Sequence, residues 1–250
     1  MKGIHAPLYL VHSFFRPPHL FLFSFPSITS CSSPPFERPV PMSTSSLTPT
    51  PVLADRLFSV RSLSRDAALV GAAALGVGLL AQVSIPMWPV PITGQTLGVM
   101  LAGAILGSRR GASAMTLYAT LGLAGVPWFS SFGAGPAYLL MPSFGFILGF
   151  IPTAWLIGRL AERRWDRSPL ASLGAFGLAS AIPFLVGVPW MWMTLFFVKG
   201  TALSLWATLS AGFFPFIPGG VVKWVLASMI LTGTWKILGA RNSASESAQG

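Results

Sequence analysis

The chain is poor in the residues that carry out most catalytic and metal chemistry. It has three histidines, all within the first twenty positions, and a single cysteine, Cys31. One cysteine excludes an internal disulfide and a cysteine metal cluster. Membrane proteases combine histidine with serine or glutamate, and no histidine follows residue 20. The sequence therefore predicts no catalytic residues and no metal site.

Acidic residues are also scarce. Six Asp and Glu stand against 16 Lys and Arg, a net charge of +10, and only Glu162 and Asp166 lie between residues 67 and 240. No carboxylate cluster is available for acid–base catalysis, and proton-coupled carriers usually keep such groups in their helices. A phosphate-binding P-loop is absent too, so any ATP must be hydrolysed by another chain. We expect a protein that is not an enzyme and holds no cofactor.

The composition points to a lipid bilayer as the surroundings. Hydrophobic residues make up 53% of the chain and charged residues 9%, whereas soluble domains carry about 25% charged residues. The basic residues lie near the ends of apolar stretches. A nucleic-acid surface would instead gather them on one soluble face among aromatic side chains, so we expect no nucleic-acid partner.

Six apolar stretches are long enough for membrane helices, which need about 20 residues each. Proline and glycine gather between them, in SIPMWPVP and WFSSFGAGP, as expected of turns. The sequence therefore predicts an all-α membrane protein, a six-transmembrane-helix bundle with spans at about 67–85, 91–107, 111–127, 138–160, 170–194 and 213–238.

The loop charges predict the orientation of this bundle. Bases precede the first span, join the second to the third and the fourth to the fifth, and follow the sixth. They are Arg56, Arg61, Arg65, Arg109, Arg110, the bases of segment 159–167, Lys236 and Arg241. The other three loops hold a single base, Lys199. Because basic loops stay in the cytoplasm, six spans with both termini cytoplasmic fit this pattern.

The composition changes at about residue 66. Residues 1–66 are rich in Ser, Pro and Phe, and we expect a disordered N-terminal extension before a membrane domain at 67–240 and a disordered tail at 241–250. A serine-rich, acid-poor start resembles a targeting peptide, which would place the protein in an organelle membrane. We favour the alternative that translation starts at Met42, which leaves a multi-pass protein of the cell (plasma) membrane.

The segment FIPGGVVK ends in Lys223, the one charged residue between Gly200 and Trp235. A lysine inside a membrane helix costs about 2.5–3.5 kcal/mol and usually faces a cavity or a partner. Gly219 and Gly220 precede it and allow a ligand to approach the main chain. Lys223 therefore predicts a site for a carboxylate that enters from outside. The alternative is that its long stem reaches the membrane interface.

Other polar and aromatic residues fall on the same predicted side of the membrane. Thr93 and Gln95 lie at the start of the second span, Tyr138 at the start of the fourth and Trp190 near the end of the fifth. Together with Lys223 they are candidates for binding a ligand. Each also has an ordinary explanation: Thr93 caps the helix, Gln95 bonds a backbone carbonyl, and the aromatic rings anchor the interface.

The first span carries small residues at a four-residue spacing, Ala68, Ala72 and Gly76. Small residues on one helix face allow another helix to approach closely. We expect either a docking face for a separate membrane subunit or close packing inside the bundle.

Three segments resemble the BioY family, the biotin-specific S-components of energy-coupling-factor (ECF) transporters. They are VPITGQTLGVMLAGAILGSRRGASAMTLYATLGLAGVPWF, PSFGFILGF and GFFPFIPGGVVK, and the likeness runs from about residue 67 to 235. It implies the ECF S-component fold, a biotin site near the outer surface, and as partners a transmembrane coupling subunit and a pair of ATPases. Docking through the first helix, at Ala68 and Ala72, is implied as well.

One position departs from the family pattern. The sixth-helix motif of the family is commonly Pro-Gly-Asp-x-x-Lys, and here Gly220 stands at the aspartate position. The departure leaves two other interpretations open: an S-component for another vitamin, or a membrane assembly protein that binds no ligand.

Overall fold

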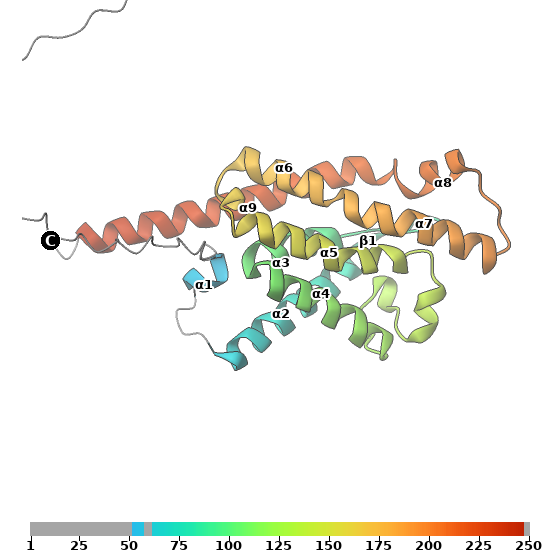
Figure 1. Cartoon of the computed structure of the whole chain (residues 1–250), viewed down its shortest axis with the longest axis horizontal. Coiled ribbons are helices and arrows are strands. Elements are labelled where there is room, and N and C mark those ends of the chain that lie inside the picture. Colours follow the sequence, from blue (N-terminus) through green and yellow to red (C-terminus); the bar gives the residue numbers. More distant parts are fainter. Residues whose placement is uncertain (1–51, 58–61, 248–250) are drawn as a thin grey trace, which may run out of the picture. The chain divides into compact units, whose positions relative to one another are not determined.

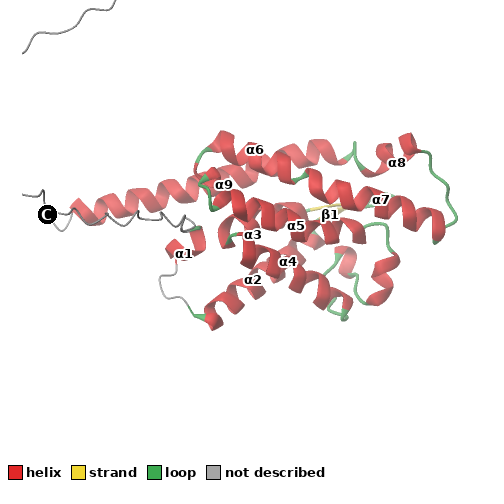
Figure 2. Ribbon diagram, in the orientation of Figure 1, coloured by secondary structure: helices red, strands yellow, loops and turns green. Residues whose placement is uncertain are grey.

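A computed structural model describes residues 52–57 and 62–247, with only the backbone described for 241–247, and these residues belong to one compact unit (Figures 1 and 2). Most of the predicted N-terminal extension, Cys31 and the three histidines included, lies outside the described residues. The described part is helical apart from one short antiparallel strand pair. The predicted all-α class is therefore confirmed.

The elements follow one another with short connections. They are α1 (Leu53–Leu57), α2 (Leu63–Gln82), β1 (Ser84–Ile85), β2 (Ile92–Thr93), α3 (Gln95–Leu106), α4 (Ser108–Leu123), the 3-10 turns η1 (Ser130–Phe132) and η2 (Pro136–Leu140), α5 (Phe144–Ala161), the 3-10 turn η3 (Trp165–Arg167), α6 (Pro169–Ala179), α7 (Ala181–Phe197), α8 (Leu205–Gly212) and α9 (Phe216–Ser247).

Four helical stretches within the described residues are long and apolar enough to cross a membrane: Leu63–Gln82, Phe144–Ala161, Pro169–Phe197 and Leu205–Ala240. The predicted second and third spans correspond to α3 and α4, which have 12 and 16 residues and are shorter than a full crossing needs. A membrane protein with several helical spans is thus supported, and the count of six stays a prediction.

The helix boundaries differ from the expected ones at both ends of the chain. Inside the range predicted to be disordered, α1 forms and buries Leu53 and Ala54. The first long helix, α2, begins at Leu63 because the Ser62 hydroxyl accepts a hydrogen bond from the Arg65 amide, which caps the helix. At the other end, α9 continues to Ser247, through most of the segment predicted as a tail.

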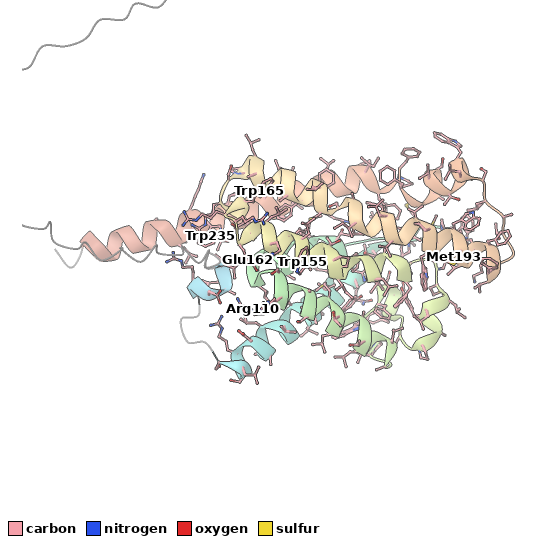
Figure 3. All side chains as sticks on the ribbon, in the orientation of Figure 1. Arg110, Trp155, Glu162, Trp165, Met193 and Trp235 are labelled. Carbon is pink, nitrogen blue, oxygen red and sulfur yellow. The ribbon has the colours of Figure 1, made fainter. Side chains whose placement is uncertain are left out.

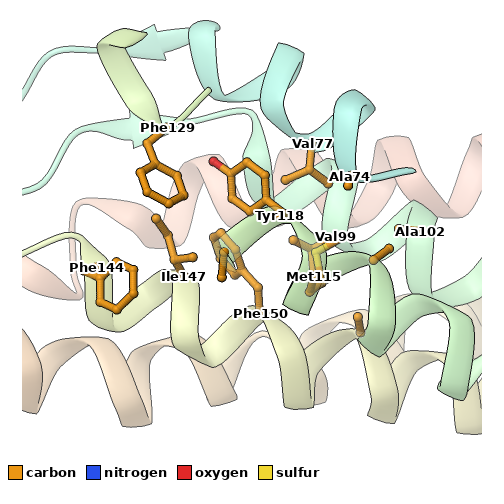
Figure 4. Packing of buried hydrophobic residues seen from close by; sticks show 13 residues of the cluster. Ala74, Val77, Val99, Ala102, Met115, Tyr118, Phe129, Phe144, Ile147 and Phe150 are labelled. Carbon is orange, nitrogen blue, oxygen red and sulfur yellow. The ribbon is translucent and has the colours of Figure 1, made fainter. Parts of the chain in front are cut away.

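The largest buried cluster lies where α2, α3, α4 and α5 meet (Figure 4). Tyr118, Phe129 and Phe144 are fully buried in it, and the Tyr118 and Phe129 rings meet edge to face with centroids 5.3 Å apart. A second cluster joins α1, α3, α5, α6 and α9 and contains Leu53, Phe176 and Leu231. The two clusters hold α3 and α5 at the centre of the bundle.

Two aspartates and two arginines tie α1, α2 and α4 together, and we name them the Asp–Arg network. Arg65 and Arg110 both contact the Asp55 carboxylate, at 2.9 and 2.8 Å, and Arg110 also reaches Asp66 at 3.1 Å. The side chains of Asp55, Arg65 and Arg110 are largely shielded from solvent, whereas that of Asp66 is 44% exposed. The network carries no net charge, because its two acids balance its two bases.

Glu162, at the end of α5, caps the start of α4. Its Oε1 accepts hydrogen bonds from the Ser108 amide at 2.9 Å and the Ser108 hydroxyl at 2.7 Å, and Arg159 contacts Oε2 at 3.2 Å. Burial alone would raise the pKa of Glu162, but the hydrogen bonds from Ser108 and Arg159 outweigh it and hold that pKa below its ordinary value. The acid is thus ionised and joins two helices.

Glycines on α5 allow the neighbouring backbones to approach. A Cβ at Gly158 would lie 2.2 Å from the Ser108 amide nitrogen, and one at Gly149 would lie 2.6 Å from the Pro183 Cα. Both neighbours are backbone atoms and cannot rotate away. These positions fix α5 against the α3–α4 turn and against α7.

We predict that Gly158→Ala destabilises the protein by about 1–3 kcal/mol, because the added methyl group overpacks a rigid contact. Gly174→Ala is the matched control, since no atom lies within 4 Å of its added Cβ. Thermal unfolding of both variants in the same detergent measures the difference. Equal melting temperatures would show that the α5 contact is not close-packed.

Candidate functional site

A cavity of about 190 Å³ opens between the start of α3, the middle of α5, the α6–α7 junction and the first turns of α9. Its polar lining side chains come from these elements and from β2, η1, η2 and the residue before α5: Thr93, Gln95, Thr96, Ser130, Tyr138, Ser143, Thr153, Ser180 and Lys223. Among the described lining residues Lys223 is the one with a charge, so the cavity is cationic at one point and otherwise neutral.

Lys223 bridges α9 to the start of α3. Its Nζ donates to the Thr93 carbonyl oxygen at 2.6 Å and to the Thr96 hydroxyl at 2.9 Å. No carboxylate of the described residues forms a salt bridge with it. The Lys223 side chain is therefore held by neutral acceptors, and no described carboxylate offsets its charge at the cavity.

A chain of hydrogen bonds continues from Thr93 into the core. The Thr93 hydroxyl donates to Gln95 Oε1 at 2.8 Å, and Gln95 Nε2 donates to the Tyr118 hydroxyl. Tyr118 in turn donates to the Trp128 carbonyl oxygen at 3.2 Å. Gln95 is only 6% exposed, so its amide is held in one orientation by partners on both sides.

Tyr138 reaches the cavity from the loop before α5. Its hydroxyl accepts from Ser143 Oγ at 3.3 Å, and its ring packs on Phe129 with centroids 4.5 Å apart. Burial raises the pKa of Tyr138, so the phenol stays neutral and can donate a hydrogen bond. The buried Ser130 hydroxyl also lines the cavity and has no hydrogen-bond partner within the described residues.

Aromatic rings form an apolar wall of the cavity. Phe146 stacks on Phe216 with centroids 6.0 Å apart, and Phe184 meets Phe146 and Phe213 edge to face at 5.8 and 5.1 Å. The four rings come from α5, α7, the α8–α9 turn and α9. They suit an apolar ligand body next to the polar positions.

The structure brings five of the predicted site residues together at the cavity: Thr93, Gln95, Tyr138, Gly220 and Lys223. Trp190 and Gly219 lie outside its lining. Trp190 packs on Phe144 instead, with ring centroids 5.9 Å apart, and Gly219 approaches Ile92.

The phenylalanine wall, Thr153 and the Ser180–Trp224 pair also line the cavity and were not predicted from the sequence; in the pair the indole donates to the hydroxyl at 2.8 Å. Aromatic and small polar residues are common on every face of a membrane helix, so these positions carry no distinguishing signal.

The predicted docking residues lie on an open face of α2. Ala68 and Ala72 are exposed, and a Cβ at Gly76 would meet no atom within 4 Å. These residues therefore do not pack inside the bundle of described helices. Neither do the described residues include a cluster of three or more His, Cys, Asp or Glu side chains that could hold a metal ion.

We predict that Thr96→Val lowers stability by about 1.5–3 kcal/mol, because it removes a hydrogen bond to a buried ammonium. Thr96→Ser keeps the hydroxyl and is expected to unfold near the wild-type temperature. Thermal unfolding of the two purified variants gives the comparison. A valine variant as stable as the serine variant would contradict a structural role for this hydrogen bond.

Comparison with known proteins places the chain among relatives of one kind. The Rhizobium etli biotin transporter BioY is 36% identical over 169 residues, which cover 65% of this chain and 87% of that protein. The Rhodobacter capsulatus biotin transporter BioY is 37% identical over 180 residues, 67% of this chain and 92% of that protein.

A crystal structure of the S-component for biotin from an ECF-type ABC transporter has a similar fold, with a TM-score of 0.59 and 24% sequence identity. The likeness covers 71% of this chain and 95% of that one. The family model for BioY matches residues 46–240, most of the chain and nearly all of its described part. The chain belongs to the BioY family.

Proposed function

We propose that this protein is the substrate-binding membrane component for biotin uptake. It captures biotin from outside the cell and mediates its entry together with an ECF coupling subunit and an ATPase pair. Family membership and the relatives named as biotin transporters support this function, and the cavity beside Lys223 is the observation that carries it. Transport, rather than an enzymatic reaction, is the activity of the chain.

The cavity matches the chemistry of biotin in three respects. Biotin carries one carboxylate, a neutral ureido ring that both donates and accepts hydrogen bonds, and an apolar body. Lys223 supplies the single positive charge, and Thr93 and Gln95 supply neutral polar groups. Tyr138 and the phenylalanine wall pack on the apolar part, a role that Trp190 does not share because it lies outside the lining.

Lys223 is proposed to meet the carboxylate. An ammonium has three N–H donors, and two of them bind Thr93 and Thr96. The third is free to reach a ligand anion without breaking the bridge to α3.

In the proposed membrane arrangement the short helices α3 and α4 complete six spans, and both termini lie in the cytoplasm of a multi-pass plasma-membrane protein. The exposed α2 face at Ala68, Ala72 and Gly76 contacts the coupling subunit. Its small side chains and open surroundings allow the close helix approach that such a contact needs.

We predict that Lys223→Ala weakens biotin binding by about ten- to a hundredfold, the effect of losing a hydrogen-bonded charge. Calorimetry with purified protein measures the change, and a melting curve checks that the variant is folded. Gly220→Asp is the companion variant: a new Cβ lies 3.7 Å or more from its neighbours, so we expect binding to be preserved or improved. Wild-type affinity in folded Lys223→Ala would remove the lysine from the site.

The same calorimetry decides between vitamins. Biotin binding that other water-soluble vitamins do not displace supports the proposal. Preferential binding of another vitamin would favour a changed specificity at Gly220, and no binding of any vitamin would favour an assembly protein.

We predict that Ala68→Trp or Ala72→Trp prevents co-purification with the coupling subunit and leaves biotin affinity unchanged, because both side chains lie on an open face away from the cavity. Leu185→Trp is the matched control, since Leu185 is 73% exposed on α7. Unchanged co-purification of both alanine variants would show that α2 is not the docking face.

A further inference from the structure

Positive charge is in excess at the end of the molecule where Trp165 and Trp235 lie, opposite Met193 (Figure 3). The Asp–Arg network is neutral, and Glu162 is occupied by Ser108 and Arg159. Asp166 is the remaining acid whose side chain is described. Apart from Lys199 and Lys223, the bases with described side chains that form no ion pair with a described residue are Arg56, Arg109, Arg163, Arg164, Arg167 and Lys236.

Arg167 lies at the centre of this excess. Its guanidinium carbon is 4.4 Å from the centroid of the Trp235 ring, and Trp235 donates to Asp166 Oδ2 at 2.6 Å. The Arg167 Nε is buried and has no hydrogen-bond partner within the described residues. Burial raises the pKa of Asp166 against the opposing hydrogen bond from Trp235, and this acid is the one carboxylate described beside Arg167.

Two further arginines lie near Arg167, one in the turn just before it and one on α1. Arg164 lies in the turn between α5 and η3, in a left-handed conformation with φ of 67°, three residues before Arg167. Arg56 is on α1, whose Leu53 belongs to the same cluster as Trp235. Burial lowers the pKa of Arg167, Asp166 opposes this, and repulsion from Arg164 and then Arg56 lowers it further.

We infer that Arg56, Arg164 and Arg167 bind the phosphate of an anionic phospholipid headgroup beside Trp235. Planar guanidinium groups match phosphate oxygens through paired hydrogen bonds, and several of them together offset their mutual repulsion when an anion lies between them. Exposed Arg56 and Arg164 would close on the headgroup from α1 and from the α5–α6 connection.

The surroundings favour a lipid as the source of the phosphate. Exposed Trp165 and Leu170 lie beside Arg164 and Arg167 in the sequence, with 41% and 82% of their surfaces accessible. Tryptophans at helix ends mark the level of lipid headgroups, and basic side chains there attract anionic lipids. This inference is independent of biotin, because the cavity at Lys223 and this arginine cluster share no residue.

The test measures thermal unfolding of the full chain in nanodiscs of phosphatidylcholine, with and without phosphatidylglycerol. We expect phosphatidylglycerol to raise the wild-type melting temperature by about 3–6 °C, as a ligand bound to the folded state does. In the double variant Arg56→Gln/Arg164→Gln at least half of this rise is lost. Arg109→Gln, which also removes an exposed charge, retains the rise.

Three results would overturn the inference. An equal phosphatidylglycerol effect in the wild type and the double variant would place lipid binding elsewhere. Stabilisation by millimolar inorganic phosphate in phosphatidylcholine, with no added effect of the anionic lipid, would assign the arginines to a free anion. No lipid effect, together with loss of the coupling subunit from the double variant, would assign them to a protein partner.

Discussion

The buried ammonium of Lys223 is the constraint on which the arrangement around the cavity depends. A charge within a membrane helix costs about 2.5–3.5 kcal/mol and must find acceptors. Here both acceptors come from the start of α3, the Thr93 carbonyl and the Thr96 hydroxyl. The β1–β2 pair places Thr93, and α3 begins two residues later, so Thr96 faces α9. The hydrogen bonds that offset the free-energy cost of placing this lysine in a membrane helix also set the position of α9 along α3.

A second polar contact holds α9 further along, where Trp235 donates to Asp166. The two contacts are twelve residues apart, about 18 Å along a helix. Between them Trp224 bonds Ser180 and Ser228 bonds Ser172, so one face of α9 is joined to α6. Within an apolar bundle these few hydrogen bonds determine the rotation and register of the helix, because van der Waals packing alone discriminates weakly between them.

Much of this arrangement could be predicted from the sequence, for a physical reason. Polar groups in apolar helices have few partners available, so Lys223, Thr93 and Gln95 were expected to converge and do. Aromatic residues do not need a particular partner. Trp190 could face lipid, the core or the cavity, and only the rotation of α7 decides that it packs on Phe144. The order of α1 could not be predicted either, because a helix of five residues is too short to show a periodic pattern and its burial depends on distant helices.

The acidic side chains join helices to one another, whereas the single charge at the cavity is a cation. All acids with described side chains lie away from the cavity, in the Asp–Arg network, at Ser108 and at Trp235. The cavity keeps one cation and neutral dipoles, and two of the three lysine donors are already engaged by the protein. An anion that takes the third donor adds a contact and breaks none. The bridge between α3 and α9 therefore leaves one lysine donor for an anion without loss of either hydrogen bond.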